Sequence, residues 1–303
     1  VYKRQQLDPS YRVFFDDGEI IDISSDIEKN YEIFERLEKN GAEKLRKYLD
    51  VCKKQYEIAM DGFVYRTYNS IFDFFSPSMV ANGLRLKAFT NYHKGVKKYF
   101  KNPKAQKLLE WITVFLGGDP RNVTSMYILV SHLEKAFGVH YVKGGVQALA
   151  DAMANVVKDQ GGQVLLNSNV ARISVNNHKS DGVILENGLK LNADIVVSNA
   201  DPGWTYDKLL PAHKKRRWSR NKLKKSRWSM GLFVWYFGTR NTREKWQDVG
   251  HHTIINGPRY RGLLSDIFDK CFLADDMSIY LHRPSITDLS LIHISEPTRR
   301  YLI

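Results

Sequence analysis

Two adjacent glycines, Gly144 and Gly145, have the clearest potential for chemistry in this sequence. They follow a short apolar stretch, residues 140–142, that is typical of a strand, and they precede a stretch, 148–157, whose apolar residues recur at helical spacing. A glycine turn between a strand and a helix brings backbone N–H groups close to a phosphate or a flavin. Turns with no binding role use the same dipeptide. The sequence contains neither a GxGxxG fingerprint nor a GxxxxGK[ST] loop, so no nucleotide site is complete on this chain.

The histidines and cysteines do not form a pattern typical of a metal site. Only two cysteines are present, Cys52 and Cys271, which excludes a disulfide framework and favours a reducing compartment. His251 and His252 are neighbours on a predicted strand, so their side chains are expected to point to opposite faces and not to share one ion. No Ser/His/Asp arrangement stands out either. We therefore expect no metal site.

The basic residues of the chain are unevenly distributed. The net charge is +13, and residues 214–227 contain nine basic residues and no acid, flanked by Trp218 and Trp228. This composition suits an anionic membrane surface, where each basic residue contributes about 1 kcal/mol and Trp prefers the interface. A solvated helix face and a nucleic-acid site are the alternatives, but no recognised nucleic-acid motif accompanies the charge. The residues expected at the membrane surface are Lys214, Lys215, Arg216, Arg217, Trp218 and Arg220.

The elements that must position these residues begin with a hairpin and helices. Two short runs of β-branched and aromatic residues from Tyr11 surround Asp16-Asp17-Gly18, which predicts a β-hairpin. A helix is expected from about Asp26 to Asn40-Gly41. A second helix is expected at 42–60, and a mostly helical block at 64–137 that includes helices at 108–116 and 124–137.

From Gly138 the pattern changes to short strands and helices. The helix after Gly145 is expected to end at Gly161-Gly162, and Asn187-Gly188 is typical of a hairpin turn. Asp201 and Pro202 are typical of a helix N-cap and first position, directly after a buried strand. Strands are predicted at 163–166, 170–175, 182–186, 189–192, 195–197, 232–237, 252–255 and 278–281, with a helix at 263–268. This is α/β architecture inside a chain that is otherwise α+β.

Three stretches in this order of elements resemble a known family: GVHYVKGGVQALADAM, GGQVLLNSNVARI and ADIVVSNADP. FLGGDPRNVTSMYILVSHLEKAFGV upstream, and HHTIINGPRYRGLLSDIF and SIYLHRPSITD downstream, extend the resemblance to about residues 8–288. The family is that of the bacterial-type carotenoid desaturases, within the flavin amine oxidase-like enzymes. Carotenoid isomerases, ketolases and retinol saturases share the SNAD-type frame and are the enzymatic alternatives, but the downstream motifs fit phytoene desaturases better.

The resemblance implies a division of the chain into interleaved domains. Residues 138–205 would form the returning segment of an FAD-binding domain of the Rossmann-like, glutathione reductase type. Residues 6–137 and 206–288 would together form a substrate- and membrane-binding domain with a mixed sheet and helices. Residues 1–5 and 289–303 resemble translated adapter sequence and are expected to be non-native ends. Because family members begin with GxGxxG and end with a second glycine-rich motif, we expect an internal fragment that binds FAD poorly.

The resemblance also implies roles for individual residues. FAD would contact Val170 through its backbone, and further contacts are expected at Gly144, Gly145, Asn199 and Ala200. An ordinary core valine is the alternative for Val170. The candidates for lining a hydrocarbon tunnel are Phe72, Phe74, Phe75, Phe89 and Tyr92, for which core packing is the alternative.

The implied reaction removes two hydrogens from a CH–CH pair of phytoene or a related long isoprenoid hydrocarbon, as a hydride to the flavin and a proton. No residue is identified as the base. The expected partners are the hydrocarbon and an anionic membrane surface, without nucleic acid, and the expected location is the bacterial cytoplasm at the inner face of the membrane. The non-enzymatic alternative is a basic protein that binds a membrane surface or nucleic acid.

Overall fold

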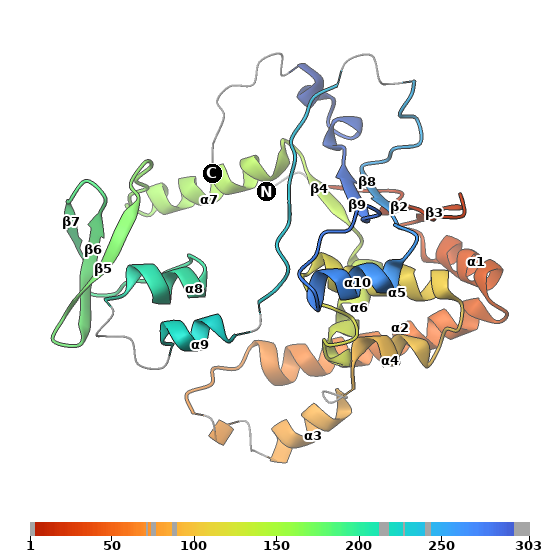
Figure 1. Cartoon of the computed structure of the whole chain (residues 1–303), viewed down its shortest axis with the longest axis horizontal. Coiled ribbons are helices and arrows are strands. Elements are labelled where there is room, and N and C mark those ends of the chain that lie inside the picture. Colours follow the sequence, from red (N-terminus) through yellow and green to blue (C-terminus); the bar gives the residue numbers. More distant parts are fainter. Residues whose placement is uncertain are drawn as a thin grey trace. The chain divides into compact units, whose positions relative to one another are not determined.

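The computed structural model describes residues 4–70, 72–73, 77–86, 90–211, 218–226, 228–239 and 244–293 (Figure 1). The chain divides into two compact units. The first contains Val1–Leu149 and Ser229–Ile303, so it combines segments from both parts of the chain, and the second is the continuous segment Ala150–Trp228. The second unit covers most of the segment predicted to be α/β, residues 138–205, but it starts within a helix and continues farther.

The first unit is built around a mixed sheet of four strands in the order β3-β2-β8-β9. Strand β2 pairs with β3 antiparallel and with β8 parallel, and β8 pairs with β9 antiparallel. The strands are β2 (Tyr11–Phe14), β3 (Ile20–Ile23), β8 (His252–Ile255) and β9 (Ile279–His282). The hairpin predicted from Tyr11 is therefore confirmed, as are the strands predicted at 252–255 and 278–281.

Alternation of side chains decides which face of the hairpin is buried. Tyr11 and Val13 on β2, and Ile21 and Ile23 on β3, are buried, as expected for residues two apart on a strand. Arg12 points to the other face, where Nε and Nη2 donate to the two carboxylate oxygens of Asp22 at 2.6 and 2.7 Å. The hairpin thus presents one apolar face to the core and one charged face.

Five helices of the first unit lie on the side of the core opposite the hairpin. They are α1 (Ile27–Leu37), α2 (Gly41–Ala59), α4 (Tyr92–Lys97), α5 (Pro103–Phe115) and α6 (Leu129–Phe137). The predicted start of the first helix is confirmed, because the Asp26 side chain caps α1 by accepting from Glu28 N at 3.0 Å. Asn102 caps α5 in the same way, with Pro103 at the first helical position.

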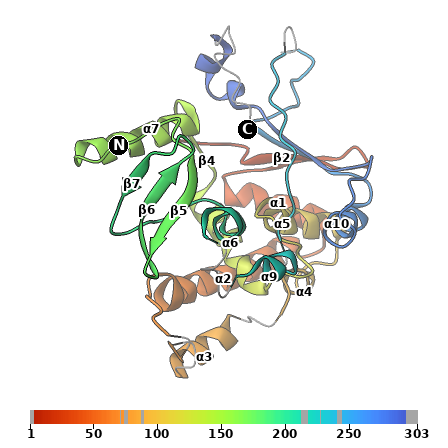
Figure 2. The same ribbon diagram turned by 60° about the vertical axis from the view of Figure 1, so that its left-hand side comes forward.

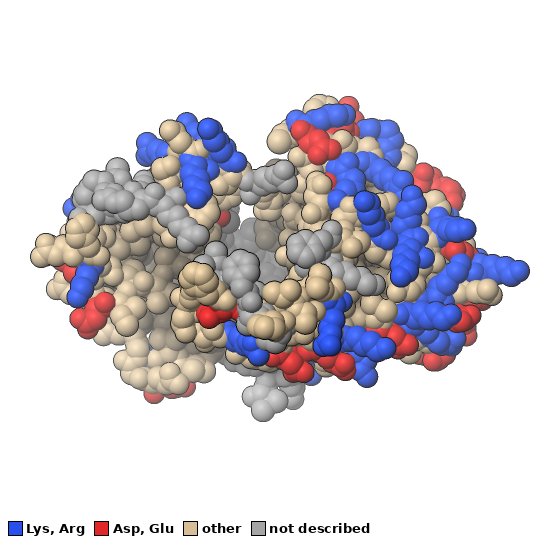
Figure 3. All heavy atoms as spheres, turned by 90° about the horizontal axis from the view of Figure 1, so that it is seen from below, with Lys and Arg blue, Asp and Glu red and all other residues tan. Residues whose placement is uncertain are grey.

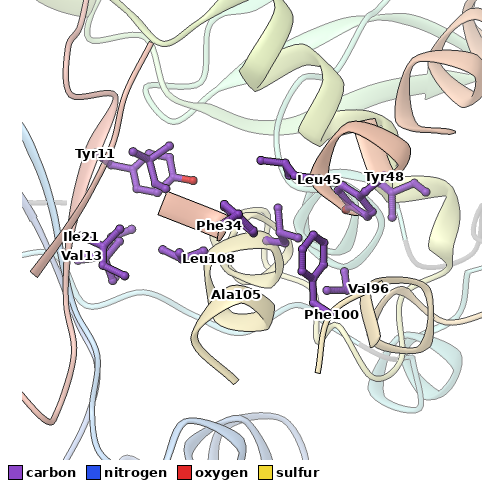
Figure 4. Packing of buried hydrophobic residues seen from close by; sticks show 14 of the residues in the cluster. Tyr11, Val13, Ile21, Phe34, Leu45, Tyr48, Val96, Phe100, Ala105 and Leu108 are labelled. Atoms are coloured by element: carbon purple, nitrogen blue, oxygen red, sulfur yellow. The ribbon is translucent and has the colours of Figure 1, made fainter. Parts of the chain in front are cut away.

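The core lies where the apolar face of the hairpin meets these helices (Figure 4). Tyr11, Val13 and Ile21 from the sheet face side chains of α1, α2 and α5. Phe34 packs edge-on against Phe100 with ring centroids 5.2 Å apart. Because burying one large apolar side chain stabilises a fold by about 1.5–3 kcal/mol, this cluster is the main source of stability in the first unit.

The remaining elements of the first unit are short, apart from one long helix. Strand β1 pairs antiparallel with β4, and helix α7 follows β4 and continues into the second unit. These elements are β1 (Arg4–Gln6), η1 (Met60–Val64), α3 (Pro77–Arg85), η3 (Ser125–Ile128), β4 (His140–Val142), α7 (Gly145–Asp159), α10 (Tyr260–Phe268), η6 (Pro284–Ile286) and η7 (Leu289–His293). The helix predicted near 263–268 is confirmed as α10.

The second unit contains an antiparallel sheet of three strands in the order β5-β6-β7 (Figure 2). Its elements are β5 (Val170–Asn176), β6 (Lys179–Leu185), β7 (Lys190–Asn192), α8 (Pro202–Trp204), η4 (Thr205–Leu209) and α9 (Arg220–Lys224). Gly188 has φ +86°, which a hairpin turn at Asn187-Gly188 requires. This hairpin and the helix start at Asp201-Pro202 are confirmed.

Three predicted strands are wrong. Residues 163–166, 195–197 and 232–237 have no strand structure, and the apolar side chains of Ile195, Val197 and Phe233 are 79%, 87% and 91% exposed. A buried strand requires hydrogen-bonding neighbours and cover on both faces. Among the described residues these segments have no neighbouring strand. Helix α7 shows the same lack of cover, because none of its side chains is buried.

Within the part of the chain that is described, no helix combines the length and apolar character needed to cross a membrane.

Candidate functional site

The glycine turn between β4 and α7 has the geometry that the sequence predicts. Gly144 and Gly145 have φ of +86° and +79°, a region in which other residues are strained. The Gly144 N–H donates to Oδ2 of Asp288 at 3.1 Å, and the hydroxyl of Tyr141 lies 3.4 Å from the same oxygen. The turn therefore holds an anionic group.

The carboxylate of Asp288 is ionised in this position. Its Oδ1 accepts from the hydroxyl and the N–H of Ser290 at 2.5 and 3.2 Å. The Ser290 hydroxyl, followed by the Gly144 N–H, lowers the pKa of Asp288. A Cβ at Gly144 would lie 3.3 Å from the Cβ of Ala148, so the close approach favours glycine. In this structure the anionic partner of the turn is the side chain of Asp288.

Val170, the first residue of β5, is accessible. The residue is 37% exposed in this chain. It pairs with Leu185 on β6, and the ladder shifts register between Val170 and Arg172. Because β5 is the edge of its sheet among the described strands, one side of its backbone has no strand partner. An edge of this kind can donate to and accept from a planar heterocycle such as a purine.

The other two candidate cofactor residues, Asn199 and Ala200, lie in the exposed segment before α8. Asp201 fixes the start of that helix, because its Oδ1 accepts from Trp204 N at 3.0 Å. Val170, Asn199 and Ala200 belong to the second unit, whereas Gly144 and Gly145 belong to the first. The five residues are therefore divided between the two units.

Two of the five aromatic candidates for a hydrocarbon tunnel can be placed. Tyr92 is fully buried, and its hydroxyl donates to Leu109 O at 2.9 Å beside Tyr48 and Ser131. Core packing, the alternative reading, accounts for Tyr92, and a tunnel-lining role is not needed to explain it. Phe72 is 78% exposed. Phe74, Phe75 and Phe89 lie outside the described residues.

The basic segment is described only in part. Lys214, Lys215, Arg216 and Arg217 lie outside the described residues. Trp218 is half-buried beneath the ammonium of Lys222, which lies 4.5 Å from its ring centroid. Arg220 is exposed and forms an ion pair with Asp207 at 2.5 Å. On the face shown in Figure 3, Lys and Arg side chains are mixed with Asp and Glu.

The expectation that His251 and His252 point away from each other was wrong. Their ring centroids lie 4.5 Å apart. Strand β8 begins only at His252, so the alternation of a regular strand does not govern His251. A third histidine, His282, lies opposite His252 in the β8–β9 ladder. No pattern in the sequence signals this pairing, because His282 is 30 residues away and only the strand register brings it close.

Comparison with known proteins identifies relatives along most of the chain. No protein-family profile matches it. A phytoene desaturase (neurosporene-forming) of Rhodobacter capsulatus is 45% identical over 93% of this chain and 54% of its own length. The protein of the same name from Cereibacter sphaeroides is 44% identical with the same coverage. A phytoene desaturase (lycopene-forming) of a Paracoccus species is 35% identical over 93% of this chain and 55% of its own length.

The chain spans about half the length of these curated relatives. The resemblance read from the glycine turn, the SNAD segment and the downstream motifs agrees with all three comparisons. By sequence, the chain is similar along 93% of its length to proteins named phytoene desaturase.

Proposed function

We propose that this chain is part of an FAD-dependent enzyme that desaturates phytoene or a closely related carotenoid precursor. The observation that carries the proposal is the 45% identity, over 93% of the chain, with a protein named phytoene desaturase. The relatives of higher identity are named as neurosporene-forming and the Paracoccus relative as lycopene-forming, so neurosporene is the product we expect first.

The candidate cofactor residues suit different parts of FAD. The open backbone edge at Val170 suits the adenine. The Gly144 N–H, which donates to the Asp288 carboxylate in this chain, suits an anionic part of FAD that would take the place of that carboxylate. Asn199 and Ala200 lie in an exposed segment and complete the set of candidate cofactor residues. When bound, FAD would supply the acceptor for the hydride. The residues of this chain would bind and orient the cofactor and the hydrocarbon.

The segments predicted as strands but found exposed support the same proposal. Residues 163–166 and 195–197 have the apolar composition of strands in a parallel sheet, which is covered on both faces. We propose that in a longer protein, of the length of the relatives, they pair with a βαβ unit that carries GxGxxG. Amide exchange at 163–166 and 195–197 should then be slow in the longer protein and fast in this chain.

An anionic membrane surface is the proposed source of the substrate, because a long hydrocarbon is soluble in the bilayer and not in water. The exposed cations of α9 and the half-buried Trp218 support this proposal. Co-sedimentation with vesicles that contain anionic lipid should fall as salt screens the charges. Equal binding to neutral vesicles at all salt concentrations would contradict it.

The deciding experiment uses the full-length protein with phytoene, FAD and liposomes. Formation of conjugated, visibly absorbing products is expected, with neurosporene as the main product. Conversion of a different carotenoid while phytoene is untouched would favour an isomerase, ketolase or saturase. If no upstream GxGxxG is found and no FAD is bound, the non-enzymatic alternative of a basic surface-binding protein is favoured.

A matched pair of glycine substitutions tests the cofactor assignment. Gly144 and Gly188 both have φ +86°, so alanine at either position has a similar backbone strain. No atom lies within 4 Å of a Cβ at Gly188, whereas a Cβ at Gly144 would contact Ala148 and change the turn that holds an anion. In the full-length protein Gly144→Ala should weaken FAD binding at least tenfold, and Gly188→Ala should not. Equal FAD affinity in both variants would remove Gly144 from the site.

A further inference from the structure

Three histidines of the first unit converge at the end of the four-stranded sheet. His251, His252 and His282 each place one ring nitrogen within 4.8 Å of the other two. The closest pair is Nε2 of His251 and Nε2 of His282, which lie 3.0 Å apart. The rings of His252 and His282 are nearly parallel, with an angle of 12° between their planes and centroids 5.2 Å apart.

The sheet itself produces this convergence. His252 and His282 are directly opposite in the antiparallel β8–β9 ladder, so their side chains share one face. His251 precedes β8, and its carbonyl accepts from Arg283 N at 2.8 Å. This hydrogen bond keeps the start of β8 beside the end of β9. The ring of His251 is buried beside Tyr141, at 5.0 Å between centroids. Two strand residues and one residue just before a strand therefore meet at one point.

Hydroxyl groups orient two of the three rings from outside the cluster. Nδ1 of His251 lies 2.6 Å from Oγ1 of Thr287, and Nδ1 of His252 lies 2.6 Å from the hydroxyl of Tyr280. Metal-binding histidines commonly hold their second ring nitrogen in this way, which fixes the ring and its tautomer. Burial, together with the neighbouring histidines, lowers the pKa of His251 and of His252 to about 4. Neutral imidazole is the form that coordinates a cation.

We propose that His251, His252 and His282 bind a divalent late first-row transition metal ion, for which Zn²⁺ is the best fit. Four ligands at about 2.0–2.1 Å around zinc are separated by about 3.3 Å from each other, close to the 3.0 Å between the two Nε2 atoms. No carboxylate or thiol of the described residues joins the cluster, which disfavours Mg²⁺ and Ca²⁺. His282 is exposed, so an ion can enter and water can occupy a fourth position.

The rival to this proposal is a hydrogen bond between two neutral imidazoles. With one Nε2 protonated and the other accepting, the 3.0 Å separation of His251 and His282 needs no metal. The two cases differ in the third histidine, because His252 is essential to a metal site and irrelevant to the hydrogen bond. The metal would also fasten β8 to β9, which a single hydrogen bond does only weakly.

The test uses the whole untagged chain, freed of metal with a chelator and titrated with Zn²⁺ and, separately, Co²⁺. We expect one equivalent of Zn²⁺ to bind and one equivalent of Co²⁺ to develop the visible bands of a four-coordinate nitrogen site. His252→Gln and His282→Gln should each weaken Zn²⁺ binding at least tenfold. His178→Asn is the matched control, because His178 is an exposed histidine with φ +66°, a conformation that asparagine tolerates.

Two results would overturn the proposal. One is an absence of stoichiometric Zn²⁺ and Co²⁺ binding by the unmodified chain, which requires no variant and so cannot be caused by misfolding. The other is Zn²⁺ affinity in His252→Gln equal to that of His178→Asn. Circular dichroism of the metal-free variants should match that of the unmodified chain, because His282 is exposed and His252 is only partly buried.

Discussion

The contact between α1 and α2 leaves no room for a side chain at Gly41. A Cβ at this position would lie 1.8 Å from the carbonyl oxygen of Phe34 and 2.4 Å from its carbonyl carbon. A carbon and an oxygen normally approach no closer than about 3.3 Å, so the two helices would have to separate by about 1.5 Å. The helices hold Phe34, Leu45 and Tyr48 in the core, where overpacking costs about 1–3 kcal/mol and occasionally more.

We therefore expect Gly41→Ala to lower the free energy of unfolding by about 3 kcal/mol, which is roughly a hundredfold in the folding equilibrium. Hydrogen exchange of the α2 amides, followed at increasing urea concentrations, measures this loss of unfolding free energy within the affected helix. Gly83→Ala is the control, because Gly83 also lies in a helix but has no atom within 4 Å of a Cβ. Alanine there should stabilise α3 by about 0.5–1 kcal/mol. A change below about 0.5 kcal/mol at Gly41 would refute the reasoning.

Three further predictions concern single side chains. Tyr92→Phe should lower the free energy of unfolding by about 1 kcal/mol in urea titrations, because Leu109 O loses a buried donor; an unchanged midpoint would contradict this. Burial raises the pKa of Glu110, which is paired with His93, above its ordinary value of 4.5, so stability should fall as pH rises from 4.5 through the raised pKa. Glu110→Gln should flatten that part of the curve of urea midpoint against pH. Phe233→Glu should change the stability of this chain by less than about 0.5 kcal/mol, because Phe233 is exposed; a larger loss would mean that this segment is packed.

Local chemistry explains most of what could be predicted from the sequence. Asp17-Gly18 and Asn187-Gly188 specify hairpin turns, and Asp26 and Asp201 specify helix starts, because each requirement is met within a few residues. The glycine turn at residues 144–145 follows from the same kind of signal. Predictions that rest on such local signals were correct in both units.

Features that depend on distant partners could not be predicted. The segment at 195–197 has the composition of a buried strand, but composition does not supply the neighbours that a strand requires. The pairing of His252 with His282 depends on the register of β8 and β9, which neither residue signals alone. The burial of Tyr92, likewise, depends on helices elsewhere in the chain that supply Tyr48, Leu109 and Ser131 as its neighbours.

The parallel pairing of β2 with β8 has a consequence for synthesis of the protein. Arg12 is aligned with Thr253, so the hairpin is made about 240 residues before its partner strand. At about 5–20 residues per second, the ribosome needs roughly 10–50 s to reach β8. During that interval the inner edge of β2 is open to pairing with other nascent chains. A chaperone that shields the hairpin until β8 is released from the ribosome should therefore raise the yield of soluble protein.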